Sequence, residues 1–443
     1  MGPMLKNVMS RLTSRAAPGG MARMALDMGE AVGEPIFPLS LAVPPLVPEP
    51  GERWPSFKER VINTLGPVMD WLKKNAGMNS SAIHSCCGLQ STGLTGQVRE
   101  ALKHGGIHLV ELDPPLVVTL MDDSIGDVEL PLFRLRHPGA NDGGGVKVAV
   151  LDSGIDSRHP WLVVAESVST CGESVDIPGR HATHVAGSIA SRDSVYGGIA
   201  PGVTLLNIKV LDSFGRGQAT FITKGIDEAL DRGAHILSMS VGFNHLPNWS
   251  QGGHGWSCAN GQCQLCMAVD NAVLTENVIA VVAAGNEHER AEFLRQNQFG
   301  STFDSEISCP GNARNALTVG ALTKQTFLTA PFSSRGPTPY NAPKPDIAAP
   351  GVNITSALVA ARDATGQVVP GQTRGALSTT LSGTSMATPI VAGAVALIRQ
   401  KRALNGQDLS PSAIRAELLE RGFRHLASPA SEVGAGRLVL ADL

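Results

Sequence analysis

A single serine near the C-terminus constrains this chain more than any other feature. Residues 381–389 read Leu-Ser-Gly-Thr-Ser-Met-Ala-Thr-Pro and lead into an apolar stretch at residues 390–398, which predicts a buried helix. Ser385 therefore lies in a tight turn where backbone N–H groups and the positive end of the helix dipole point at whatever the hydroxyl attacks. The alternative is a plain helix N-cap, a common role for serine and threonine.

Two upstream segments supply the partners that a serine nucleophile needs. Residues 146–151 predict a buried parallel strand that ends in Asp152, and functional groups gather at the carboxyl ends of such strands. His181 begins a predicted helix of small residues. A hydroxyl is a poor nucleophile at neutral pH, so it needs a nearby base and a third group that orients the base. Asp152, His181 and Ser385 fit these three roles.

The motifs around these residues resemble those of the subtilisin-like serine endopeptidases, the subtilase family. They are Asp-Ser-Gly at residues 152–154, His-Ala-Thr-His-Val-Ala-Gly at 181–187 and Gly-Thr-Ser-Met-Ala-Thr-Pro at 383–389, in the family's order. The resemblance covers about residues 123–443. It implies an α/β, subtilisin-like three-layer fold with a mainly parallel central sheet, and hydrolysis of protein or peptide substrates.

A further segment resembles the part of the family that stabilises the oxyanion. Residues 281–287 read Val-Val-Ala-Ala-Gly-Asn-Glu, and the resemblance assigns the donor role to Asn286 together with the backbone N–H of Ser385. Such a donor is needed because tetrahedral attack places negative charge on the substrate oxygen. An isolated Gly-Asn pair would otherwise indicate a turn after a buried strand.

Two segments resemble the family's substrate-binding edges, which would pair with an extended substrate backbone as added strands do. The first segment follows a predicted strand and consists of Ser240, Val241 and Gly242. The second contains a glycine-rich turn and consists of Gly215, Arg216 and Gly217. The same resemblance puts Ser308 at the base of the primary pocket and Glu287 at its rim. A small polar base implies broad specificity, and Glu287 implies some tolerance for Lys or Arg.

Three features depart from the family's pattern. Ala182 stands where glycine usually follows the catalytic histidine, and we expect it to lie harmlessly in a helical first turn. Residues 191–198 offer one carboxylate where calcium takes about six to eight oxygens, so we predict no calcium there, and no cofactor is expected. The stretches 243–265, 288–307 and 356–379 are long and predict surface loops.

The region before the catalytic domain has its own pattern. Residues 1–34 predict a flexible tail, and residues 35–122 predict a small α+β domain. Its expected elements are helices at 56–65, 68–74 and 96–104 and strands at 82–89 and 107–113. The order and the Val-Glu-Leu-Asp ending resemble the family's inhibitory propeptide, and Asp113 precedes Asp152 by 39 positions. A docking domain without an inhibitory role is the alternative.

The resemblance to a propeptide implies that the N-terminal domain is an intramolecular inhibitor. Residues 114–121 would thread the cleft as a product-like strand that Pro114 and Pro115 stiffen, and self-cleavage would fall between Val118 and Asp123. An alternative function is a latent subtilase module that a partner activates in a regulatory system.

Composition excludes other classes. The net charge is −3, charged residues make up 17% of the chain, and no basic stripe occurs, so nucleic-acid binding is not expected. No run of about 18 apolar residues predicts a membrane span. The first 23 residues are basic but lack an apolar core, so we predict no secretory signal and favour the cytoplasm, although relatives with propeptides are often exported.

The chain has seven cysteines, of which three form a Cys-x4-Cys-x2-Cys cluster. Cys258, Cys263 and Cys266, with His254 nearby, contain only one clean metal-binding pair, so we expect no metal. Unpaired thiols, a local disulfide and a structural zinc remain the alternatives. Cys309 lies beside the predicted primary pocket.

Overall fold

The computed structural model describes residues 37–42, 48–49, 51–76, 80–83, 88–93, 109–112, 127–246, 258–297, 305–363 and 365–443. The chain divides into an N-terminal unit, Met1–Pro114, and a C-terminal unit, Pro115–Leu443. The predicted boundary at residue 122 and the predicted cleavage window at 118–123 lie outside the described residues, as do the tail at 1–34 and the expected helix at 96–104. These expectations stay predictions.

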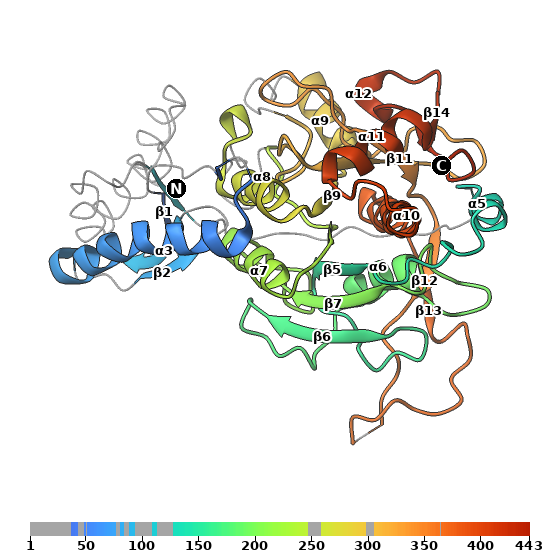
Figure 1. Cartoon of the computed structure of the whole chain (residues 1–443), viewed down its shortest axis with the longest axis horizontal. Helices are drawn as coiled ribbons and strands as arrows, with labels where there is room; N and C mark the ends of the chain where they lie inside the picture. Colours follow the sequence, from blue (N-terminus) through green and yellow to red (C-terminus); the bar gives the residue numbers. More distant parts are fainter. Residues whose placement is uncertain are drawn as a thin grey trace. The chain divides into compact units, whose positions relative to one another are not determined.

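The N-terminal unit combines a helix with an antiparallel sheet (Figure 1). The sheet has the order β2-β3-β1-β4, and α3 contacts β2 and β3. The elements are β1 (Phe37–Ala42), α3 (Trp54–Trp71), a short π-helical turn (Leu72–Ala76), β2 (Ser80–Ile83), β3 (Gly88–Gly93) and β4 (Leu109–Leu112). The prediction of an α+β arrangement agrees with these elements.

Residues 56–65 and 68–74 are helical as predicted, but the division of this unit into elements differs at two places. The two expected helices are one helix, α3, which continues through Pro67 because its buried stripe, Trp54, Phe57, Val61, Leu65 and Val68, keeps helical spacing across the proline. The expected strand at 82–89 is two antiparallel strands, β2 and β3, with Ile83 opposite Gly88. The residue pattern of this segment does not reveal where one strand ends and the next begins.

The C-terminal unit is built on a nine-stranded sheet with the order β14-β15-β11-β10-β9-β8-β5-β7-β6. Its neighbouring strands pair in parallel, except that β14 and β15 are antiparallel. The strands are β5 (Lys147–Asp152), β6 (Val164–Ser169), β7 (Thr204–Lys209), β8 (Ile236–Met239), β9 (Ile279–Ala283), β10 (Leu317–Leu322), β11 (Ile347–Pro350), β14 (Phe423–Arg424) and β15 (Arg437–Leu438). The predicted α/β class with a mainly parallel sheet is confirmed.

Helices cover both faces of this sheet. They are α5 (Leu130–Arg136), α6 (Arg180–Ala190), α7 (Ala219–Asp231), α8 (Gln264–Glu276), α9 (His288–Gln296), α10 (Thr384–Leu404), α11 (Pro411–Arg421) and α12 (Ala430–Val433), with a 3-10 turn, η3 (Ala259–Gly261). Side chains alternate across a strand, so β5 can contribute to two cores at once.

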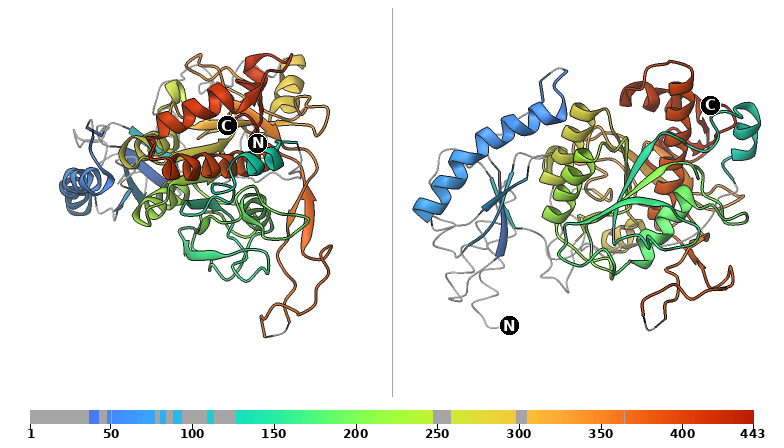
Figure 2. Two further views of the ribbon diagram at one scale, coloured as in Figure 1. Left: turned by 45° about the vertical axis from the view of Figure 1, so that its right-hand side comes forward. Right: turned by 60° about the horizontal axis from the view of Figure 1, so that its bottom comes forward.

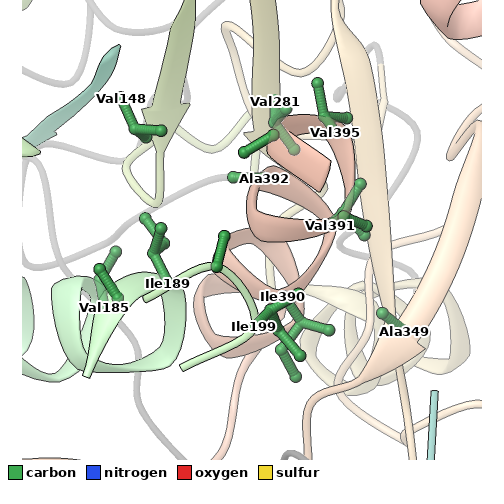
Figure 3. Packing of buried hydrophobic residues seen from close by; sticks show 14 of the residues in the cluster. Val148, Val185, Ile189, Ile199, Val281, Ala349, Ile390, Val391, Ala392 and Val395 are labelled. Atoms are coloured by element: carbon green, nitrogen blue, oxygen red, sulfur yellow. The ribbon is translucent and has the colours of Figure 1, made fainter. Parts of the chain in front are cut away.

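On one face, Val148 and Val150 of β5 join the core of α6 and α10, where Ile189 and Val391 pack (Figure 3). On the other face α7 packs against the sheet: a Cβ added to Gly225 would lie 3.2 Å from Ile208 Cγ2 of β7 and 3.6 Å from Leu151 Cδ2 of β5. The continuous burial of β5 and its neighbours is typical of a parallel sheet between two helical layers.

A hairpin lies outside the main sheet. Strands β12 (Ile354–Ala357) and β13 (Ser378–Leu381) pair antiparallel, and the segment between them extends away from the body of the unit (Figures 1 and 2). The predicted surface loop at 356–379 is therefore confirmed. Among the described residues, helices long and apolar enough to cross a bilayer are absent.

Candidate active site

Asp152 and His181 form a buried pair at the carboxyl end of β5. Asp152 is the last residue of β5, and His181 lies in the first turn of α6. His181 Nδ1 lies 2.9 Å from Asp152 Oδ1 and 2.8 Å from Oδ2. Ser153 fixes the carboxylate, because its N–H and its hydroxyl donate to Oδ1 at 2.6 and 3.0 Å. An imidazole held in this way by its Nδ1–H carries its lone pair on Nε2.

Ser385 stands in the first turn of α10, beside the end of β8. Its hydroxyl donates to the carbonyl of Ser240 at 3.2 Å, and the Ser240 hydroxyl donates to the carbonyl of Ser385 at 2.8 Å. Because β5 and β8 are neighbours with Val150 beside Ser238, Ser240 is level with Asp152. The three predicted catalytic residues thus come from the same edge of the sheet, and each is at most 3% exposed.

Asn286 is oriented by the residue next to Ser385. Its Oδ1 accepts hydrogen bonds from the N–H of Thr384 at 3.0 Å and from the Thr384 hydroxyl at 2.9 Å. The Thr384 hydroxyl in turn accepts the N–H of Gly285 at 3.1 Å. With the amide oxygen fixed by two donors, Nδ2 is the end of the side chain that can donate to an oxyanion.

The first turn of α10 supplies a second kind of donor. The first N–H groups of a helix have no acceptor within the helix, and the helix dipole makes this end partly positive. The N–H of Ser385 belongs to this turn. That the amide of Asn286 and the N–H of Ser385 act together on an oxyanion stays a prediction, with which these contacts are compatible.

The predicted binding edge at 240–242 and the segment 281–287 meet at Ser308. A Cβ added to Gly242 would lie 2.9 Å from Ser308 Cβ, and one added to Gly285 would lie 2.5 Å from Ser308 Oγ. Ser308 is held by its backbone N–H, which donates to the Ala284 carbonyl at 2.8 Å. Ser240 and Val241, which precede Gly242, are also buried. Larger residues at the two glycine positions would fill the space next to Ser308.

Glu287 follows Asn286 and caps α9. Its N–H donates to the Ser334 hydroxyl at 3.0 Å, and Arg290 lies 3.6 Å from its carboxylate. Burial raises the pKa of Glu287 above its usual value of 4.5, and Arg290 opposes this effect. The carboxyl group is therefore desolvated and only partly compensated by Arg290; its place at the rim of the primary pocket stays a prediction.

The second predicted edge is a structured turn. Asp212 Oδ1 accepts the N–H groups of Phe214 and Arg216 at 3.0 and 2.8 Å, and Gly215 has a φ of 79°. Gly217 contacts the chain so closely that a Cβ would lie 2.7 Å from Leu211 Cδ2. The side chains of Phe214 and Arg216 are exposed and stack with 5.0 Å between the guanidinium carbon and the ring centre.

Sequence reasoning missed the residues that support the site. Ser153, Thr384 and the side chain of Ser240 each form a hydrogen bond to a catalytic residue or its partner. Lys209 is fully buried, and its Nζ donates to the Ser153 carbonyl at 2.5 Å and contacts Glu173 at 2.8 Å. The sequence signal for Ser153 is its position next to Asp152, and the signal for Thr384 is its position next to Ser385.

The departures from the family's pattern have simple structural explanations. Ala182 lies in the first turn of α6 and is absent from the residues with positive φ, as predicted. In the loop at 191–198, the Asp193 carboxylate accepts two backbone N–H groups and pairs with Arg374 at 3.0 Å. Calcium there would have to displace these partners, and its absence stays a prediction.

His184 differs from His181 although it lies in the same helix. It is fully buried, and its Nε2 lies 3.0 Å from the Ile354 carbonyl. Burial, reinforced by the nearby His181 and Arg180, lowers the pKa of His184 well below 6.5. His184 is therefore a neutral core residue that ties α6 to β12.

Comparison with known proteins agrees with this geometry. The subtilase family model matches residues 143–436. Subtilisin E of Bacillus subtilis (strain 168) is 37% identical over 270 residues, which are 60% of this chain and 58% of that protein. Subtilisin of Bacillus pumilus is 37% identical over 270 residues, with 60% and 80% covered. Alkaline protease of Shouchella clausii is 34% identical over 310 residues, with 67% of each covered.

The matched residues contain every catalytic position named above. The chain spans 58% of the length of subtilisin E, so the likeness concerns this region and not the whole of that relative. A family model that covers most of the chain, together with the buried Asp152–His181 pair and Ser385 at the start of α10, leads to one conclusion: the chain belongs to the subtilase family.

Proposed function

We propose that this protein is a serine endopeptidase that cleaves peptide bonds through an acyl-enzyme. The observation that carries the proposal is the buried Asp152–His181 contact of 2.8 Å at the strand edge where Ser385 begins α10. Subtilisin E and the alkaline protease of Shouchella clausii, which share this region, are named as subtilisin and protease.

The reaction would begin with proton transfer from Ser385 to His181. Asp152 holds His181 Nδ1–H, so the lone pair on Nε2 accepts the Ser385 proton as Oγ attacks the substrate carbonyl. The same carboxylate stabilises the imidazolium that forms. His181 then donates this proton to the leaving amine, and water releases the acyl group with His181 again acting as base.

The negative charge on the substrate oxygen would be held by Asn286 Nδ2 and the N–H of Ser385. Thr384 orients the amide before substrate binds, so little reorganisation is needed when the charge develops. The hydroxyl of Ser385 has first to leave the carbonyl of Ser240, to which it donates in this structure. A rotation about its single side-chain torsion accomplishes that change.

The substrate backbone would lie between the segments 240–242 and 215–217, and its primary side chain would enter beside Ser308. A small polar base with no charge favours a broad range of side chains. Glu287 adds affinity for Lys or Arg when it is ionised. Protein or peptide substrates follow from this arrangement, because main-chain pairing requires an extended peptide.

Hydrolysis of labelled casein tests the proposal directly. We expect the wild-type chain to hydrolyse casein and the Ser385→Ala variant to lose activity by at least about 10⁴-fold. Ser382→Ala, a serine in the same segment whose hydroxyl accepts the N–H of Asn353, is the matched control and should retain activity. Equal hydrolysis by wild type and Ser385→Ala would contradict the proposal.

We also propose that the enzyme processes itself, with the N-terminal unit as its inhibitor. The support is the α+β composition of that unit and its resemblance to the family's propeptide. Intact mass spectrometry of the wild type over time should show a break between residues 118 and 123 that is absent in Ser385→Ala. A chain that stays whole yet hydrolyses casein after a partner is added would favour the latent regulatory module instead.

A further inference from the structure

Four cysteine side chains that have no part in the proposed catalysis meet in the C-terminal unit. Cys258 precedes η3, Cys263 is the N-cap of α8, Cys266 lies in its first turn, and Cys309 follows Ser308. All four are buried, and their Sγ atoms lie within 4.8 Å of one another. All four are free thiols in this structure.

We propose that Cys258, Cys263, Cys266 and Cys309 bind one structural zinc ion. Zinc binds thiolate sulfur at about 2.3 Å in a tetrahedron, which separates the sulfur atoms by about 3.8 Å. Here Cys258 Sγ lies 3.7 Å from Cys266 Sγ, and Cys266 Sγ lies 3.6 Å from Cys309 Sγ. Four sulfur ligands that enclose one point form the closed set of a structural site, with no position left for substrate.

The backbone around the cluster is shaped to bring these side chains together. Asn260 and Gly261 both have positive φ, 62° and 68°, and the Gly261 N–H donates to the Cys258 carbonyl at 3.2 Å. This turn directs Cys258 back toward Cys263. A side chain at Gly261 would collide with Tyr340, since a Cβ there would lie 2.6 Å from Cε1. The turn therefore requires glycine by both conformation and space.

The start of α8 suits a negatively charged metal centre. Cys263 is the N-cap residue of this helix, and Cys266 lies in its first turn. The N–H groups of the first turn have no acceptor within the helix, and they lie at the same end of α8 as these two sulfur atoms. Zinc with four thiolates carries a net charge of −2, and the positive end of a helix dipole stabilises negative charge. The helix thus offsets the charge that such a centre would bring into the interior.

Polar groups outside the four sulfur atoms also face the cluster. His245 Nε2 lies 3.4 Å from Cys309 Sγ, and Asn312 Nδ2 lies 3.7 Å from the same atom. Asn312 is held in place, because its Nδ2 also donates to the Ile307 carbonyl at 2.7 Å. A donor to a coordinating sulfur, such as the Asn312 amide here, fixes its orientation and tunes the bond to the metal, as outer groups do in known metal sites.

A second group with metal-binding side chains, His288, Glu292 and Glu306, does not make the same case. Glu306 is already paired with Arg295 at 2.6 Å and with His288 at 2.9 Å, and it accepts the N–H of Arg335 at 3.0 Å. Its charge is neutralised by protein groups. In the cysteine cluster, by contrast, Cys266 Sγ has the sulfur atoms of Cys258 and Cys309 within 3.7 Å.

The zinc would tie the segment 258–266 to the wall of the predicted primary pocket. Cys309 follows Ser308 directly and pairs with Phe243, whose N–H donates to the Cys309 carbonyl at 2.9 Å. Phe243 in turn follows Gly242, which contacts Ser308. One ion would therefore fix the two segments that border Ser308, the one at Gly242 and Phe243 and the one at Cys309. This role does not depend on whether the enzyme is active.

Metal analysis of the full chain tests the proposal without any reading of activity. The Ser385→Ala variant serves as the host, so that self-digestion does not disturb the measurement. After gel filtration, elemental mass spectrometry should find one zinc per chain. Cys266→Ser in this host should lower bound zinc by at least about tenfold. The control is Cys171→Ser, a cysteine outside the cluster, which should keep the zinc.

Cobalt replacement provides a second reading on the host itself, independent of whether Cys266→Ser folds. The cobalt protein should show thiolate-to-cobalt charge-transfer absorption and the visible bands of tetrahedral coordination. A folded host with no zinc after growth with added zinc would overturn the proposal. So would stoichiometric iron in its place, or two disulfides among the four cysteines on alkylation under denaturing, non-reducing conditions.

Discussion

The catalytic cluster and the cysteine cluster lie in the same unit but are encoded differently in the sequence. Asp152, His181 and Ser385 each stand where a regular element begins or ends, so periodicity locates them. Three of the four cysteines share one short segment, and the fourth is 43 residues beyond Cys266. The pairing of Phe243 with Cys309 contributes to holding that fourth sulfur in place.

The two clusters also differ in the role that we propose for each, catalysis for the first and stability for the second. In the proposed catalytic cluster, hydrogen bonds orient the groups that would exchange a proton. In the cysteine cluster, the four ligands converge and leave no open position, so we expect it to act on stability. Changes in the first site should therefore alter rates, and changes in the second should alter unfolding. The predictions below separate these effects, from the largest to the smallest.

Asp152→Asn should give the largest effect on rate with a normal fold. The amide cannot accept Nδ1–H from His181 as the carboxylate does, so the imidazole loses its correct tautomer and its charge stabilisation. We expect kcat to fall by about 10⁴-fold. Steady-state hydrolysis of a peptide substrate measures this, and an unchanged melting temperature shows that the fold is kept. A loss below tenfold would contradict the role of Asp152.

Asn286→Ala should lower kcat by about 10²–10³-fold with little change in KM, since the interaction forms only in the transition state. Thr384→Val removes one of the two donors that hold Asn286 Oδ1 and should cost about two- to tenfold. In the double variant the Thr384 effect should vanish, because the amide it orients is gone. Fully additive effects would show that Thr384 does not act through Asn286.

Zinc removal should change stability more than rate. Chelation of the Ser385→Ala host should lower its melting temperature, and added zinc should restore it. At a free zinc concentration about 100 times the dissociation constant, binding adds about 2.7 kcal/mol to the free energy of unfolding. Cys171→Ser should respond as the host does, whereas Cys266→Ser should not respond. An identical response of Cys266→Ser and the host would contradict the zinc site.

The smallest effect concerns the pH dependence of specificity. Because burial raises the pKa of Glu287 above 4.5, its carboxyl group stays neutral at low pH and becomes anionic only above that raised value. The preference for Lys over Leu substrates should therefore increase as pH rises through this range, by up to about tenfold. Glu287→Gln should show a preference that does not change with pH. A parallel rise in both proteins would exclude Glu287 as the cause.

Much of the C-terminal unit could be predicted from sequence, because buried parallel strands are apolar throughout and their polar ends mark the site. The supporting contacts could not. Thr384 orients Asn286 across 98 positions of sequence, and no local pattern records that contact. The local pattern also fails for α3, which is one helix where two are predicted. Burial of one continuous apolar stripe along the helix outweighs the tendency of Pro67 to interrupt it.

The cysteine site shows this limit most clearly. The segment 258–266 alone offers one close pair of ligands, which led to the expectation of no metal, and His254 lies outside the described residues. The sequence places Cys309 beside the predicted primary pocket and gives no sign that it is a metal ligand. The distance of 3.6 Å between Cys266 Sγ and Cys309 Sγ revises that expectation.

Labelling with a fluorophosphonate tests the central claim most directly, because this small electrophile forms a stable bond only with an activated serine. We predict one adduct per wild-type chain, located by peptide mass spectrometry at Ser385, and much slower labelling of Asp152→Asn. Ser385→Ala should carry no adduct. A folded wild-type chain that remains unlabelled, or equal labelling of Ser385→Ala, would contradict the proposed catalytic role of Ser385.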